Sequence, residues 1–165
     1  MRGGNRAELL LVHAASLAPM SLPRPGGQDV MQDNKTIVKR WEDEFKNRAN
    51  VGITDELMSA DFVHHLPFPG LPPGREGLKL VGQGIFQSFD HEHLKTEVEL
   101  CLAVDDRVIT RSRVRARQTG AWNGIPASNK DVEWTEITIF RLRDGKIVEM
   151  TAEGNFLGLL GQLRS

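Results

Sequence analysis

A single carboxylate, Glu136, falls on the apolar face that the sequence predicts for one β-strand. Residues alternate from Val132 to Arg141, so that Glu136 shares a face with Trp134 and Phe140. Burial of a carboxyl group raises its pKa, which brings proton exchange closer to neutral pH. Glu136 is therefore a candidate acid–base residue. The alternative is a structural carboxylate whose charge is satisfied by a neighbouring hydroxyl, a histidine or water.

His65 is the candidate partner of Glu136, as a hydrogen-bond donor or a proton shuttle. We expect it at the mouth of the same pocket, beside a proline-rich loop. Polar side chains on neighbouring strands would hold a carbonyl or enolate oxygen, and bulky ones would line the cavity. The expected ligand-binding residues are Trp41, Phe68, Thr110, Ser112, Gln118, Trp134, Thr138 and Met150. No metal site is expected, because His64-His65 and His91-x-His93 have no further ligand at suitable spacing.

The strands that position Glu136 form a predicted antiparallel meander. Asp144-Gly145 separates two β-rich runs, and this dipeptide favours a type I′ hairpin because both turn residues take positive φ. Upstream of Glu136, the residue pattern changes to a period of two from Lys95. Two further strands are expected there. The first has Val98, Leu100, Leu102 and Val104 on one face, and the second runs from Val108 to Gln118.

The second of these strands carries a row of arginines at positions 111, 113, 115 and 117. Such a row could bind an anion. Glutamates fall on matching faces of neighbouring strands, at positions 97, 99, 133, 149 and 153. Cross-strand ion pairing on a solvated or subunit-facing surface explains both rows, and we favour this interpretation over an anion site.

Helices are predicted before the strands. Ile37, Val38, Trp41 and Phe45 recur at helical spacing, which predicts a helix from about Lys35, capped by Asp33 or Asn34. The charged residues Lys39, Arg40, Glu42, Asp43 and Lys46 are expected on its opposite face. Trp41 and Phe45 form either a ligand wall or a helix-to-sheet contact, and the sequence favours the contact. Another helix is expected over residues 75–89.

Helices followed by a meander predict an α+β domain. We expect N-terminal helices packed on a strongly curved antiparallel sheet that forms a cone with an internal pocket. The length of 165 residues suggests one such domain, over residues 31–165. Residues 1–30 differ in composition and are expected to be a disordered leader or the product of a mis-assigned start codon. Their short apolar piece weakly resembles a signal peptide.

Composition argues against several functions and partners. A net charge of −1 gives no electrostatic basis for binding nucleic acid or a membrane surface. No apolar run is long enough to span a bilayer. Cys101 is the only cysteine, which indicates a reducing, cytoplasmic location, with export through the weak leader signal as the alternative. A long sheet face with paired charges suits a homodimer.

Several stretches between Met31 and Leu163 form recognisable motifs. They are Phe62-Val63-His64-His65-Leu66-Pro67-Phe68-Pro69-Gly70, Pro73-Gly74-Arg75-Glu76-Gly77, Gly120-Ala121-Trp122-Asn123-Gly124-Ile125-Pro126-Ala127, Ile139-Phe140-Arg141, Asp144-Gly145-Lys146-Ile147-Val148-Glu149 and Leu157-Gly158-Leu159-Leu160-Gly161-Gln162-Leu163. Together they resemble the SnoaL-like polyketide cyclase (ester cyclase) family. The resemblance implies the nuclear transport factor 2-like α+β cone. It also implies acid–base catalysis of an intramolecular aldol closure, with no metal or organic cofactor, on a small apolar polyketide-like carbonyl compound.

The chain departs from the family pattern at its last strand. Family members commonly have His-Trp-Asp there, with the Asp as acid–base residue, whereas this chain has Met150, Thr151 and Ala152. Neither Met150 nor Ala152 can exchange a proton. Asn155 replaces a further family aspartate and Gln118 replaces a family histidine, whereas His65 matches one.

Two hypotheses about function therefore remain. In the first, the protein is a cyclase- or isomerase-type enzyme that uses Glu136 and His65. In the second, it is a non-catalytic protein of the same fold that binds a small apolar molecule. Fold alone does not decide between them, because one fold hosts many activities.

Overall fold

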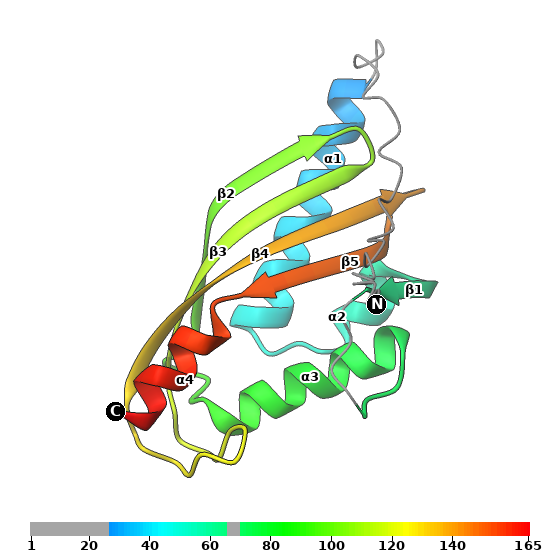
Figure 1. Ribbon diagram of the computed structural model, residues 1–165. Coiled ribbons are helices and arrows are strands. Elements are labelled where there is room, and N and C mark those ends of the chain that lie inside the picture. The colour runs from blue at the N-terminus through cyan, green and yellow to red at the C-terminus, as the bar shows by residue number, and fades with distance from the viewer. Residues whose placement is uncertain (1–26, 66–69) are drawn as a thin grey trace, which may run out of the picture.

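A computed structural model describes residues 27–65 and 70–165, which form an α+β fold (Figure 1). The elements are α1 (Gly27–Trp41), the π-helix η1 (Glu42–Asn47), α2 (Ile53–Leu57), β1 (Met58–His64), α3 (Gly74–Ser88), β2 (Lys95–Val104), β3 (Arg107–Arg117), β4 (Asp131–Arg143), β5 (Lys146–Gly154) and α4 (Phe156–Arg164). Among the described helices, none has the length and apolar character needed to cross a membrane.

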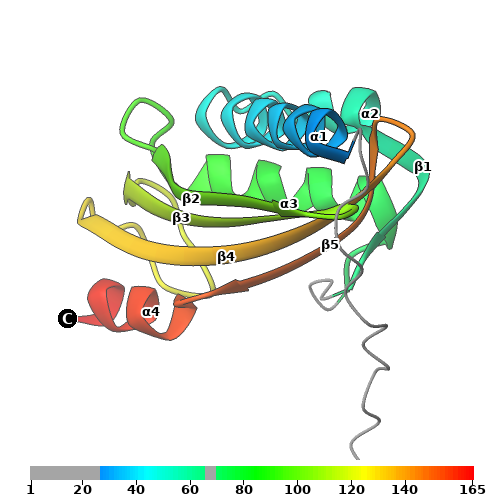
Figure 2. The same ribbon diagram turned by 90° about the horizontal axis from the view of Figure 1, so that it is seen from above.

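The sheet has five strands in the order β1-β5-β4-β3-β2 and is curled without closing. Helices α1 and α3 lie against one face of this sheet, as Figure 2 shows, and α4 follows β5 at one end. The predicted fold class is confirmed. One detail differs, because the edge strand β1 pairs with β5 in parallel, so the sheet is not purely antiparallel.

The hairpin between β4 and β5 forms as predicted. Asp144 and Gly145 take φ values of 51° and 72°, which is the backbone that a type I′ turn requires. The predicted alternation of β4 is also confirmed, since Trp134 and Phe140 are buried on the face that carries Glu136. The turn and the alternation together aim Glu136 at the concave side of the sheet.

Strand β2 contradicts the predicted alternation. The pairing register with β3 shifts between Val98 and Leu100, which marks a β-bulge. Beyond the bulge the faces exchange, because one extra residue reverses every later side chain. The large side chains of Leu100, Leu102 and Val104 are consequently exposed. The smaller side chains at positions 101 and 103 pack against the core instead.

Helix α1 differs from its prediction at both ends. It begins at Gly27, so neither Asp33 nor Asn34 caps it, and its first turn falls within the predicted leader of residues 1–30. The rest of that leader, like Leu66 and Phe68 of the proline-rich loop, lies outside the described residues. At its other end α1 continues into the π-helix η1. Helix α3 matches its prediction within one residue at each end.

The core consists of two clusters of buried side chains. In the first, Trp41 stacks on Phe45 at 4.8 Å between ring centroids and meets Phe140 edge-on at 5.5 Å. This is the predicted helix-to-sheet contact. In the second, at the other end of the sheet, Leu159 and Leu163 of α4 are buried. The two clusters leave a pocket between α3 and the concave face of the sheet.

Candidate functional site

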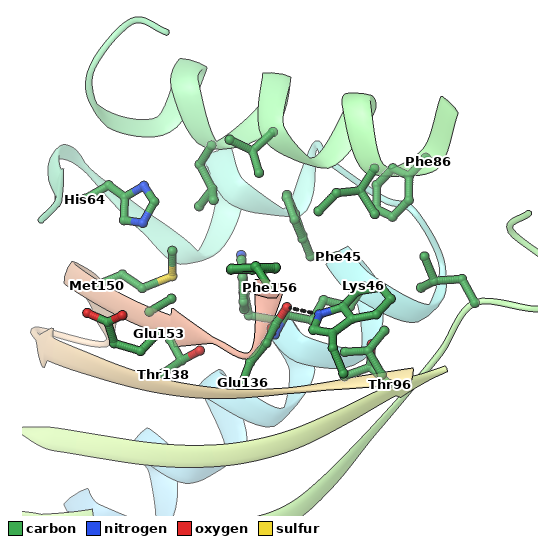
Figure 3. Close-up of a pocket in the computed structure, with 18 residues that line it drawn as sticks. Phe45, Lys46, His64, Phe86, Thr96, Glu136, Thr138, Met150, Glu153 and Phe156 are labelled. Carbon is green, nitrogen blue, oxygen red and sulfur yellow. Dashed lines mark hydrogen bonds and ion pairs between the residues drawn. The ribbon is translucent and has the colours of Figure 1, made fainter. Parts of the chain in front are cut away.

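The pocket has a volume of about 280 Å³ and is mostly apolar (Figure 3). Helix α3 supplies one wall, and strands β4 and β5 supply the facing wall. The lining residues are Trp41, Phe45, Lys46, His64, Leu78, Val81, Ile85, Phe86, Leu94, Thr96, Val114, Trp134, Glu136, Thr138, Met150, Ala152, Glu153 and Phe156. A cavity of this size with a few convergent polar groups is the usual form of a small-molecule site.

Glu136 is the carboxylate at the base of this pocket. Its Oε2 atom lies 2.8 Å from Nζ of Lys46, and its Oε1 atom accepts a hydrogen bond of 2.8 Å from Nε1 of Trp134 (Figure 3). Only 14% of the Glu136 side chain is exposed. Both oxygens therefore have a donor, and the carboxylate is held in one orientation.

Lys46 lines the pocket, and the sequence prediction did not place it there. It was expected on the solvated face of its helix together with Glu42, but only 16% and 2% of these side chains are exposed. The π-helix η1 accounts for the error, because its i→i+5 turns are wider than α-helical turns and place Glu42 and Lys46 beside Trp41 and Phe45. Such π-helical turns are frequent at functional sites.

A second carboxylate lies behind Lys46. Oε2 of Glu42 is 2.9 Å from Nζ of Lys46, and Oε1 of Glu42 accepts a 3.1 Å hydrogen bond from the hydroxyl of Thr110. One ammonium group thus bridges two carboxylates, one on η1 and one on β4. The ammonium also lies 5.9 Å from the centre of the Trp41 ring, within reach of a cation–π contact.

The ion pair reverses the pKa expectation for Glu136. Burial alone would raise its pKa, but the charge of Lys46 and the hydrogen bonds from Lys46 and Trp134 outweigh burial and hold the pKa below its ordinary value. Burial likewise opposes the charge of Lys46, yet the two carboxylates raise the pKa of the ammonium. Both groups are therefore ionised at neutral pH.

The placement predicted for His65 is wrong. Strand β1 turns Phe62 and His64 inward and His65 outward, where Nε2 of His65 lies 3.0 Å from Glu149 and about half of the side chain is exposed. His64 lines the pocket instead, at the opposite end from Lys46 (Figure 3). Burial lowers the pKa of His64, and the neighbouring His65 lowers it further, so its imidazole is neutral at neutral pH.

The other predicted ligand-binding residues have four different outcomes. Trp41, Trp134, Thr138 and Met150 line the pocket. Thr110 and Ser112 are buried, and neither is among the lining residues. Gln118 is not in the pocket, because its side chain bonds the Ile125 carbonyl and Ser128 in the loop after β3, and Phe68 lies outside the described residues.

The arginine row lies on the opposite, outer face of the sheet and is paired as predicted. Arg113 contacts Glu99 at 2.6 Å and Glu133 at 2.5 Å, and Arg115 contacts Glu133 at 2.9 Å. Arg111 also pairs with Glu99, and Arg117 pairs with Asp131. These carboxylates satisfy the row, which supports ion pairing over an anion site. Among the described residues, no cluster of three or more His, Cys, Asp or Glu side chains is arranged to hold a metal ion.

The SnoaL-like polyketide cyclase family model matches residues 36–163, which is most of the chain. The chain belongs to this family. A comparison with curated protein sequences gave no match.

Several solved structures share the fold. A predicted SnoaL-like polyketide cyclase from Jannaschia sp. CCS1 is 23% identical with a TM-score of 0.71, and the match covers 82% of this chain and 94% of that one. TsrD from Streptomyces laurentii is 23% identical with a TM-score of 0.71, covering 80% and 95%. IdmH from Streptomyces antibioticus, a predicted polyketide cyclase, is 27% identical with a TM-score of 0.69, covering 80% and 99%.

In this chain the paired charges at the base of the pocket do not come from β5. Met150 and Ala152 of β5 do line the pocket, but their side chains cannot carry a proton. Asn155 caps α4 by accepting a 3.1 Å hydrogen bond from the Gly158 backbone. The ionisable groups at the base of the pocket come instead from η1 and β4, as Lys46 and Glu136.

Proposed function

We propose that the protein is a cofactor-free acid–base enzyme of cyclase or isomerase type that acts on a small apolar, polyketide-like carbonyl compound. One observation carries this proposal. The ion pair of Lys46 and Glu136 lies at the base of an apolar pocket, and both side chains keep some exposure to it. Charges are rarely retained in such surroundings without a specific task, because their desolvation is costly.

The pair supplies the two functions that enolate chemistry needs. Ionised Glu136 accepts a proton from the carbon next to a carbonyl group, and the Lys46 ammonium stabilises the negative oxygen that results. A carboxylate whose pKa lies well below neutral can still act as the base when a positioned donor stabilises the enolate. The enolate then attacks a second carbonyl in a cyclase, or is reprotonated at another carbon in an isomerase.

His64 is the candidate for returning the proton at the far end of the pocket. Its neutral imidazole has one donor and one acceptor nitrogen, so it can relay a proton without changing its net charge. We propose it in place of His65, which bonds Glu149 on the outer face.

Hydrogen–deuterium exchange at activated carbon tests this function without knowledge of the natural substrate. A panel of apolar aryl ketones and β-diketones is incubated with the protein in deuterium oxide, and loss of the α-proton signal is followed by NMR. We expect acceleration by the wild-type protein and a fall of about 100-fold in Glu136→Gln, the usual scale for loss of a general base. Binding is followed separately through the fluorescence of Trp41 and Trp134, which line the pocket.

The second hypothesis, a non-catalytic binding protein, predicts a different result. Ketones that bind would show no faster exchange in the presence of the wild-type protein, and Glu136→Gln would change neither binding nor exchange. Glu133→Gln is the matched control, because this carboxylate lies on the outer face of the same strand. Full exchange activity in a folded Glu136→Gln variant would remove Glu136 from the mechanism.

We also propose that the protein is a cytoplasmic homodimer that associates through the outer face of its sheet. Beside the Arg and Glu rows, this face exposes a group of aliphatic side chains from β2 and β4, namely Leu100, Leu102, Val104, Ile137 and Ile139. A clustered apolar patch with a polar rim is typical of an association surface. The cytoplasmic location rests on the single cysteine, Cys101.

Sedimentation velocity at micromolar concentration tests the dimer. Leu102→Glu places a charge in the centre of the patch, so we expect it to shift the protein to a monomer. Leu157→Glu is the control, because Leu157 is an exposed leucine on α4. A wild-type monomer at high concentration would contradict the proposal.

A further inference from the structure

The base of the pocket holds more negative than positive charge. The Lys46 ammonium contacts Glu136 at 2.8 Å and Glu42 at 2.9 Å, so a single cation serves two carboxylates. His64, at the other end of the pocket, is neutral. Among the described lining residues, Lys46 is the only lysine or arginine. The local sum of charges is therefore negative.

Glu42 is fixed in this arrangement. Its side chain is 2% exposed, and the hydroxyl of Thr110 donates a hydrogen bond to the oxygen that does not face Lys46. Withdrawal of Glu42 to solvent would require movement of the π-helix that carries it. Glu42 thus occupies one side of Lys46 permanently, while Glu136 occupies a second side.

A ligand carboxylate would find no free cation in such a pocket. To reach Lys46 it would have to displace Glu136 or bind as a third anion, and either event leaves a desolvated negative charge without a partner. An uncharged carbonyl oxygen escapes this penalty, because it can accept a hydrogen bond from Lys46 without adding charge.

We propose that Glu42 is a specificity-determining residue that makes the pocket accept uncharged ligands and reject carboxylates. The proposal rests on the pocket being the substrate site, as in the proposed function, but not on catalysis. In this proposal, the ligand group that contacts Lys46 is the carbonyl of a ketone, an ester or an amide. The part of the ligand that enters the pocket carries no ionised acid.

Three matched ligands test the proposal. They are an acetylnaphthalene that carries a carboxylate, its methyl ester and its primary amide, and their dissociation constants are measured by tryptophan fluorescence and calorimetry at pH 7. For the wild-type protein we expect the ester and the amide to bind at least about tenfold more tightly than the carboxylate. Equal or tighter binding of the carboxylate would overturn the proposal without any variant.

Glu42→Gln then assigns the selectivity to one residue. This substitution keeps the size of the side chain and removes one negative charge, so that Glu136 alone balances the charge of Lys46. The carboxylate should gain about tenfold in affinity, while the amide changes little. If Glu42→Gln does not fold, as judged by circular dichroism, Glu42→Met takes its place as an apolar side chain of similar length.

Glu99→Gln is the control for a long-range effect of charge, because it removes the same charge on the outer face of the sheet. It should leave the affinity for all three ligands unchanged.

An unchanged ratio of ester to carboxylate affinity in Glu42→Gln would overturn the role of Glu42. Selective binding without hydrogen exchange would remove only the proposed enzyme function, whereas failure of all three ligands to bind would overturn both.

Discussion

The two faces of the sheet carry similar ion pairs in opposite surroundings. On the outer face, the side chains of Arg113, Glu99 and Glu133 are 30%, 24% and 41% exposed, so water screens their contacts. On the inner face, Lys46 and Glu136 meet at the base of an apolar pocket, with the nearly inaccessible Glu42 behind them. Each pair joins a cationic side chain to a glutamate, and the pairs differ most in their access to water.

Exposure to water distinguishes ion pairs that only balance charge on the surface from an ion pair that is buried for a function. An exposed pair contributes little to stability and is readily exchanged for other polar residues. A buried pair costs desolvation energy, and removal of one partner leaves the other unsatisfied. The presence of Lys46, Glu136 and Glu42 within an apolar pocket therefore points to a task, whereas the exposed ion pairs of the outer face require no such explanation.

The largest effect is expected from Lys46→Met. The substitution leaves Glu42 and Glu136 facing each other without a cation, so the free energy of unfolding should fall by about 3–5 kcal/mol. Urea denaturation followed by circular dichroism measures the change. Additional replacement of Glu42 and Glu136 by glutamine should recover part of the loss, because the unpaired charges are then gone. A loss as small as that of a surface pair would show that water reaches the cluster.

A smaller effect, dependent on pH, is expected from Glu136→Gln. The pKa of Glu136 is lower in the folded protein than in the unfolded chain, so the ionised carboxylate stabilises the fold above the unfolded pKa of about 4.3 and loses this contribution as pH falls through the folded value. At pH 7 the variant should be less stable than the wild type by about 2 kcal/mol, the scale of a hydrogen bond to a charged group. Denaturation series from pH 7 downward should show the gap closing in acid; a constant gap would contradict ionisation of Glu136.

The smallest effect is expected from Arg113→Met on the outer face. Methionine keeps much of the apolar stem of arginine and removes only its contacts with Glu99 and Glu133. The loss in unfolding free energy should stay below about 1 kcal/mol. It should shrink further in about 1 M salt, which screens exposed charges. A large loss that does not depend on salt would show that the ion pairs of Arg113 are as shielded from water as those of Lys46.

Local patterns were sufficient to predict much of the fold. The alternation of β4 and the Asp144-Gly145 turn depend on the chemistry of neighbouring residues, and both are confirmed. The same patterns aimed Glu136 at the pocket and paired the arginine row with glutamates across strands. Period and turn type are visible in a sequence because each is determined over a few consecutive residues.

The errors in the site arise where the backbone departs from its regular period. Lys46 was expected in solvent because an α-helical period was assumed across η1, where the backbone widens to a π-helix. His65 was expected at the mouth of the pocket, whereas β1 turns His64 toward the pocket, and two adjacent histidines carry no signal of which one faces the core. Burial of Glu42 and Lys46, which are four residues apart, could have been predicted only by assuming the period of a π-helix.

Because of the bulge at Glu99, the length of β2 determines which of its side chains face α1. Deletion of that one residue would return Leu100 and Leu102 to the inner face, where Cys101 and Ala103 now lie beneath α1. Bulkier side chains there would push the helix outward, and the continuous turn into η1 would shift Lys46 with it. Deletion of Glu99, whose side chain faces away from the pocket, would thus displace Lys46 and disturb Glu136 on the opposite face of the sheet.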